Sequence, residues 1–95
     1  GVSGDDLRKI AIDLRSANSN SVVALLSNND GKPVLVVAVS DQSRAAGVKA
    51  GALVKIGSTV LGGGGGGKDD FAQGGGTDSS KSLDAIAAIS QSLIG

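Results

Sequence analysis

The chain has 95 residues, 40% of them hydrophobic, and its nine basic and nine acidic residues give a net charge of zero. Because the sequence contains neither Cys nor His, a disulfide framework and a thiolate or imidazole metal site are excluded. No apolar run approaches the roughly 18 residues of a membrane span, and the start lacks a signal-peptide pattern, so we expect a cytoplasmic domain without a membrane partner.

The first part of the chain predicts a helix followed by two paired strands. Arg8, Lys9 and Arg15 are expected on a solvated face of the helix, since its apolar residues recur at helical spacing after a candidate N-cap at Ser3: Leu7, Ile10, Ala11 and Leu14. Segments 21–27 and 34–39 are apolar and β-branched, and the Asp-Gly pair at 30–31 supplies hairpin turn chemistry. We expect antiparallel pairing, with the second strand central because both of its faces are apolar.

The second part predicts a helix, a short strand and a final helix. Helical spacing returns from Lys49 to Leu61, where Gly51 and Gly57 favour close packing against a sheet. A strand is expected at 70–73, and a last amphipathic helix follows from Leu83, Ile86, Ile89 and Leu93. The fold class is therefore α/β, a small single domain with the order helix-strand-strand-helix-strand-helix and a mixed sheet of about three strands covered by helices.

Residues 62–76 depart furthest from ordinary composition. Six glycines precede Lys68, and three more follow a short mixed segment. Glycine-rich backbone can approach a phosphate closely, but it also forms linkers. A linker is disfavoured because only residues 68–95 follow the run, and chains below roughly 40 residues seldom fold alone. We expect an internal loop in which Lys68 contacts phosphate or pairs with a neighbouring Asp.

Catalysis by this segment is not expected. Gly62 to Lys68 fits the start of a P-loop, but the next residue is Asp69 instead of Ser or Thr, and the flanking strand and helix are in the wrong order. Asp69 and Asp70 are adjacent, so on a strand they point to opposite faces and cannot act as a pair. No catalytic residue and no metal site are assigned.

The segment GGGGGGKDDFAQGGGTD resembles the glycine-rich motif of the C-terminal domain of alanyl-tRNA synthetases, a module shared with DHH-type phosphoesterases. Asp69 stands where the family usually has Pro, and Phe71 where it usually has Met. The stretch 47–54 also looks like the family's helix before the motif. The positions that match the motif are Gly62 to Gly67, Lys68, Asp70, Ala72, Gln73, Gly75 and Gly76.

The resemblance implies that residues 1–95 are a C-terminal tRNA-binding accessory domain, with its glycine-rich loop at 62–76, cut from a larger synthetase. It implies contact with the outer corner of alanine tRNA, so that aminoacylation and editing share one tRNA. ATP and zinc would belong to other domains, and this fragment would carry no cofactor or chemistry. Expected partners are tRNA, the other synthetase domains and a second copy. The expected nucleic-acid-binding residues are Gly62, Gly63, Gly64, Gly65, Gly66, Gly67, Lys68, Gln73, Gly74, Gly75, Gly76 and Thr77.

Two alternatives remain open at this point. The domain could hold single-stranded nucleic acid for a DHH-type phosphoesterase, although such relatives more often carry a His in the glycine cluster. It could also be a structural dimerisation domain, which suits the neutral charge. Phe71 is the only aromatic residue and is expected in the core, so base stacking is disfavoured and recognition by shape and backbone is expected.

Overall fold

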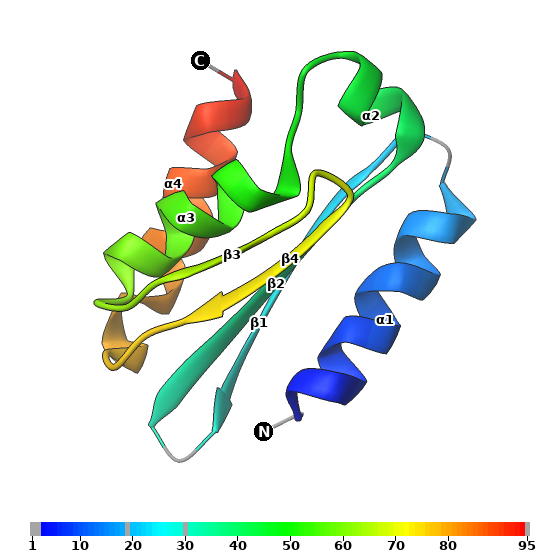
Figure 1. Cartoon of the computed structure of the whole chain (residues 1–95). Helices are drawn as coiled ribbons and strands as arrows, with labels where there is room; N and C mark the ends of the chain where they lie inside the picture. Colours follow the sequence, from blue (N-terminus) through cyan, green and yellow to red (C-terminus); the bar gives the residue numbers. More distant parts are fainter. Residues whose placement is uncertain (1–2, 19, 30, 95) are drawn as a thin grey trace.

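The computed structural model describes residues 3–18, 20–29 and 31–94. The helices are α1 (Gly4–Ala17), α2 (Asp41–Ala45), α3 (Ala50–Val60) and α4 (Ser82–Ile94), with a 3₁₀ turn η1 (Ser79–Lys81) before α4. The strands are β1 (Val22–Asn29), β2 (Lys32–Val39), β3 (Gly65–Gly67) and β4 (Phe71–Gly75) (Figure 1). The predicted element order is confirmed, and α2 and β3 are added to it.

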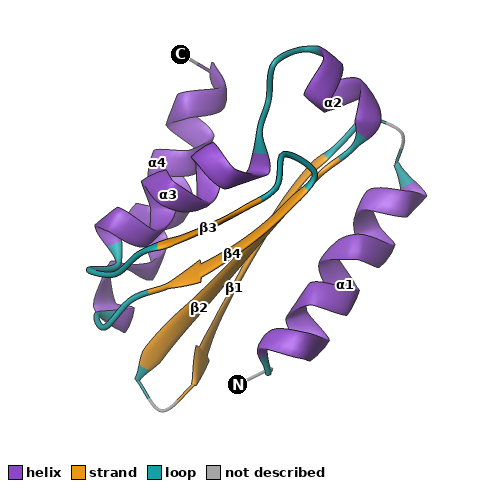
Figure 2. Ribbon diagram, viewed as in Figure 1, coloured by secondary structure: helices purple, strands orange, loops and turns teal. Residues whose placement is uncertain are grey.

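The four strands form one sheet in the order β1-β2-β4-β3 (Figure 2). The expectation of a mixed sheet of about three strands is wrong in both respects, because every pair is antiparallel and part of the glycine run forms β3. The reason lies in the connection after β2. After β2 the chain crosses over through α3 and continues in β3, which runs parallel to β2 but is not its neighbour. The β3–β4 hairpin then reverses the direction of the chain, and β4 fills the position between β2 and β3.

Helices cover both faces of the sheet. α1 lies on one face, while α3 and α4 lie together on the other (Figure 1). Leu35, Val37 and Val39 face α3 and α4, and Val36 and Ala38 face α1; all five are completely buried. The prediction that the second strand is central is therefore confirmed.

Helix starts and close packing follow the sequence. The Ser3 hydroxyl accepts a hydrogen bond from the Asp6 N–H at 3.2 Å, which confirms it as the N-cap of α1. A Cβ on Gly57 would lie 2.6 Å from Leu35 Cδ2 and 2.8 Å from Ile89 Cδ1, so this glycine lets α3 approach its neighbours. The predicted packing role of Gly57 is confirmed.

Local side-chain and backbone geometry also shapes η1 and the first hairpin. Asp78 caps η1, and the hydrogen bond from the Ser80 side chain lowers the pKa of its carboxyl group. Gly31 has a φ of 78°, as a tight hairpin turn requires, but Asp30 of the expected turn lies outside the described residues. Over the described ranges, no helix is both long and apolar enough to cross a bilayer.

Candidate nucleic-acid interface

The glycine run begins by ending a helix. Gly62 follows the last turn of α3 with a φ of 80°, and its N–H donates to the Thr59 carbonyl at 3.2 Å. The Gly63 N–H donates to the Ser58 carbonyl at 2.9 Å, which completes a Schellman cap. A residue with a side chain would be strained at position 62, because the backbone there is left-handed. Its role is to end α3.

The following glycines alternate between a packed and an open environment, as successive strand residues do. A Cβ on Gly65 would lie 2.7 Å from the Gln73 carbonyl oxygen and 2.8 Å from Val54 Cγ1. A Cβ on Gly64 or Gly66 would meet nothing within 4 Å. The segment 62–76 is therefore not one continuous loop: it contains a β hairpin with one side packed on α3 and the other side open.

The second glycine group is packed at the base of this hairpin. A Cβ on Gly74 would collide with the Ser58 hydroxyl, and one on Gly75 would lie 2.7 Å from the Pro33 carbonyl oxygen. Gly76 packs against Leu61 in the same way, and the Thr77 N–H donates to the Leu61 carbonyl at 3.0 Å. Gly74, Gly75, Gly76 and Thr77 thus join the hairpin to the rest of the fold.

The open side of the hairpin forms one wall of a groove. α1 packs over β1 and β2 and reaches β4 at Phe71, so it leaves the same face of β3 and of the rest of β4 uncovered. A depression of about 340 Å³ lies there, between α1 and the hairpin. Its lining includes Arg8, Gly66, Lys68, Phe71 and Gln73. This groove brings Lys68, Gln73 and the open glycine backbone together.

Arg8 is the residue that sequence reasoning missed. Its guanidinium carbon lies 5.1 Å from the centroid of the Phe71 ring, within the range of a cation–π interaction. Phe71 is half-buried and packs against the α1 side of the core, so its expected core role is confirmed. The helical spacing could have indicated that Arg8 and Arg15 act together, since they are seven residues apart and share one flank of α1.

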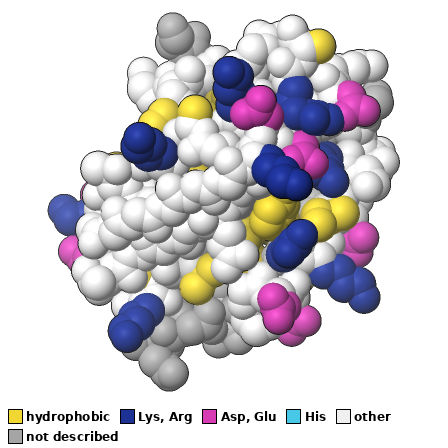
Figure 3. All heavy atoms as spheres, viewed as in Figure 1, with side chains coloured by type: hydrophobic (Ala, Val, Ile, Leu, Met, Phe, Trp, Pro, Cys, Tyr) yellow, Lys and Arg dark blue, Asp and Glu magenta, His cyan; other side chains and the backbone are white. Residues whose placement is uncertain are grey.

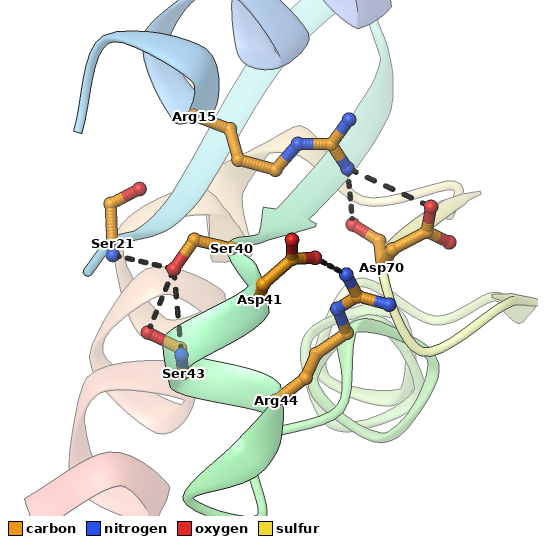
Figure 4. Close-up of polar contacts among 7 residues, drawn as sticks. All are labelled: Arg15, Ser21, Ser40, Asp41, Ser43, Arg44 and Asp70. Carbon is orange, nitrogen blue, oxygen red and sulfur yellow. Dashed lines mark hydrogen bonds and ion pairs between the residues drawn. The ribbon is translucent and has the colours of Figure 1, made fainter. Parts of the chain in front are cut away.

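Main-chain and side-chain contacts fix the tip of the hairpin. The Lys68 N–H donates to the Phe71 carbonyl at 2.9 Å, and the Asp69 carbonyl accepts from the first N–H of α3, that of Ala50, also at 2.9 Å. The Asp70 carbonyl accepts from the Arg15 guanidinium at 2.9 Å, and the Arg15 Nη1 lies 3.9 Å from the Asp70 carboxylate (Figure 4). A glycine-rich segment is thereby held in one conformation by α1 and α3.

The side chain of Lys68 is left exposed by this arrangement. Among the described residues, the ion pairs are Arg15–Asp70 and Arg44–Asp41, and Lys68 belongs to neither. The expected alternative, in which Lys68 pairs with Asp69 or Asp70, is therefore not observed. Its ammonium group is available to an external anion.

Charged side chains crowd this part of the surface. In the space-filling view, basic and acidic side chains gather over the hairpin tip and the adjoining parts of α1 and α2 (Figure 3). The local field is mixed because Asp41 and Asp70 lie among the cations Arg15 and Arg44. Within the described ranges, no group of three or more acidic residues could hold a metal ion. The arrangement suits contact with phosphate by a few cations.

The fold and the groove together define a small α/β module that presents a glycine-rich hairpin beside a basic helix flank. The DHHA1 domain family matches residues 1–95, and the chain belongs to this family.

Two relatives and one solved structure are similar to the chain over most of its length. It is 51% identical over 87 residues to an alanine–tRNA ligase of Paenarthrobacter aurescens and 53% identical over 91 residues to one of Arthrobacter sp.. These matches cover 90% and 93% of the chain but only 10% of each ligase. The crystal structure of the C-Ala domain from Aquifex aeolicus alanyl-tRNA synthetase has a TM-score of 0.92 and 34% identity, and the match covers 99% of this chain and 84% of that one. The chain thus resembles one domain of an aminoacyl-tRNA synthetase.

Proposed function

We propose that this chain is a tRNA-binding accessory domain of an alanine–tRNA ligase, which holds the outer corner of alanine tRNA so that aminoacylation and editing act on one molecule. The chain spans about a tenth of the length of the ligases it matches, so those reactions would belong to other domains. ATP and zinc would likewise be bound elsewhere in the parent enzyme, and the domain would act in the cytoplasm.

The observation that carries the proposal is the groove between α1 and the hairpin. Lys68, which forms no ion pair with another described residue, offers its ammonium group at the rim, and Arg8 offers a guanidinium group on the opposite wall. Between them, Gly66 presents backbone with no side chain, so a sugar-phosphate chain can approach the strand closely. Gln73, which is exposed and lies beside Gly66 on β4, adds an amide donor and acceptor.

This composition favours recognition by shape and backbone. A positive charge on Lys68 or Arg8 attracts phosphate irrespective of sequence, and Phe71 is already covered by Arg8. The net charge of zero limits the general attraction to nucleic acid, so binding is expected to be local and modest. The rest of the parent enzyme would supply additional affinity.

On this proposal, the residues predicted to bind nucleic acid fall into two groups. Gly64, Gly66, Lys68 and Gln73 face the open side and would contact RNA. The other glycines and Thr77 would support the hairpin through packing, and Arg8 joins the contact set. The alternative of a DHH-type phosphoesterase module is less favoured because the two relatives described above are alanine–tRNA ligases.

The test is tRNA affinity measured by fluorescence anisotropy over a series of salt concentrations. Removing one phosphate contact reduces the magnitude of the slope of log K against log salt by about 1, so Lys68→Ala should do so. Lys55→Ala is the matched control, because Lys55 is exposed on α3, on the other face of the sheet. It should leave both affinity and slope unchanged.

Two results would contradict the proposal. An unchanged slope for Lys68→Ala would remove Lys68 from the interface. Equal affinity for a poly-U strand and for folded tRNA would contradict recognition by shape and favour a single-strand-binding module.

A further inference from the structure

We propose that a second cavity, beyond the hairpin tip, binds a phosphate group through Arg15 and Arg44. We call it the arginine pocket; its volume is about 490 Å³. Its lining includes Arg15, Asn18, Ser40, Asp41, Arg44 and Asp70.

The arginine pocket is separate from the proposed nucleic-acid groove. Asp70 lines both cavities, but the cations of the groove, Arg8 and Lys68, do not line the arginine pocket. The inference therefore goes beyond the proposed function. Its first test uses inorganic phosphate, so it can succeed or fail independently of tRNA binding by the groove.

Three elements bring the charges of this pocket together. Arg15 comes from the last turn of α1, and Asp41 and Arg44 come from the two ends of α2. Asp70 lies between β3 and β4, at the hairpin tip. The two guanidinium groups and the two carboxylates meet in the same space (Figure 4). Both cations can therefore reach one ligand.

In each ion pair the cation is the less exposed partner. The exposed fractions of the side chains are 21% for Arg15 against 41% for Asp70, and 36% for Arg44 against 91% for Asp41. An exposed carboxylate can turn into solvent at little cost, whereas the guanidinium groups remain at the wall. An external anion can therefore take the place of either carboxylate.

Arg44 has a donor that its present partner does not use. Its Nη2 donates to Asp41, while its Nε is buried and has no hydrogen-bond partner among the described residues. A guanidinium group presents Nε and Nη2 side by side, in a fork that matches two oxygens of one anion. A small turn of the side chain that uncovers Nε would let a phosphate accept from both nitrogens.

Arg15 is held in place without its carboxylate partner. Its Nη1 donates to the Asp70 carbonyl at 2.9 Å but lies 3.9 Å from the Asp70 carboxylate, which is beyond hydrogen-bond range. Within the described chain, the guanidinium of Arg15 donates through Nη1 alone. Nε and Nη2 are therefore left for a ligand.

Phosphate is the anion that fits these donors best. It offers more acceptor oxygens than a carboxylate, so Arg15 and Arg44 can share it, and arginine forks match its geometry. Cavities of roughly 300–1,000 Å³ hold small-molecule ligands, so this one has room for more than the phosphate alone. The phosphate could be carried by a mononucleotide or by an RNA strand that passes the hairpin tip.

The experiment is a titration of the 95-residue chain with inorganic phosphate, followed by heteronuclear NMR at constant pH and ionic strength. Saturable shifts are expected at the Nε–H signals of Arg15 and Arg44. Arg44→Lys keeps the charge but loses the fork, so it should weaken binding by about tenfold. Asp41→Asn removes a competing carboxylate, so it should strengthen binding about two- to fivefold, the effect of one exposed ion pair.

Two exposed residues on the other face of the sheet supply matched controls. Lys55→Ala removes a full charge from α3, and Asp84→Asn neutralises a carboxylate on α4. Both should bind phosphate like the parent. Chloride at the same ionic strength should not shift the two Nε–H signals.

Two further titrations identify the carrier of the phosphate. AMP that binds more tightly than inorganic phosphate would indicate a small phosphorylated ligand. If AMP binds like phosphate and tRNA shifts the Arg44 Nε–H signal, the carrier is RNA.

Three results would overturn the proposal. The first is a phosphate titration without saturable shifts, or with shifts that chloride reproduces. The second is Arg44→Lys binding phosphate like the parent. The third is Asp41→Asn binding no better than Asp84→Asn.

Discussion

Valine substitutions at Gly65 and Gly66 separate the packing role of the glycine hairpin from its proposed binding role. The two residues are adjacent on β3, and neither has a left-handed φ. A Cβ on Gly65 would lie 2.4 Å from Gly74 Cα on β4 and 2.8 Å from Val54 Cγ1 on α3, whereas a Cβ on Gly66 would meet nothing within 4 Å. The same substitution therefore places its side chain against packed atoms at position 65 and into open space at position 66.

The expected magnitudes follow from this contrast. Overpacking at Gly65 should lower the free energy of unfolding by about 1–3 kcal/mol. For a domain of this size each 1 kcal/mol shifts the Tm by about 4–8 °C, so Gly65→Val should melt roughly 4–24 °C below the parent. Gly66→Val should melt within a few degrees of the parent, because a β-branched residue suits an exposed strand.

The assay is thermal unfolding followed by circular dichroism, with tRNA affinity measured on the variants that fold. Gly66→Val should retain the fold and lose affinity, since its side chain would occupy the groove. If Gly65→Val melted like the parent, the close contacts of Gly65 with β4 and α3 would be wrong. If Gly66→Val bound tRNA like the parent, the open face of β3 would not be part of the interface.

Three other outcomes can be measured. The Ser58 hydroxyl is completely buried and has no hydrogen-bond partner in the described part of the chain. Ser58→Ala should therefore raise the free energy of unfolding, measured by urea unfolding, by about 1 kcal/mol. A loss of stability would mean that the hydroxyl has a partner. Arg15→Met removes the tether to Asp70, and hydrogen exchange should show faster exchange than in the parent at the amides of Lys68 and Val39, which donate to the Phe71 and Asp70 carbonyls, while unaltered exchange would show that the main chain alone fixes the tip. The isolated chain should neither release alanine from alanyl-tRNA nor cut oligonucleotides with manganese, and either activity would contradict the accessory role.

Local sequence patterns determined α1, α3, α4 and the first hairpin. The spacing of Leu7 and Ala11 specified α1, because burying one stripe of a helix imposes that period, whereas Ile10 and Leu14 of the predicted stripe are 44% and 43% exposed. The segment at Val34–Val39 could be recognised as a central strand because both faces are apolar, which requires cover on each side. The cap at Ser3 is equally local, since the hydroxyl and the N–H it accepts from are three residues apart.

The roles of the individual glycines were decided only by the tertiary structure. Glycine has no side chain, so a glycine run carries no apolar period that would predict β3 or distinguish Gly65 from Gly66. Their difference arises because α3 lies against one side of the hairpin and nothing covers the other. Likewise Arg8 meets Phe71 only because the sheet order β1-β2-β4-β3 brings β4 beside α1. Contacts between residues so far apart in sequence depend on strand order, and strand order is set by the packing of the whole chain.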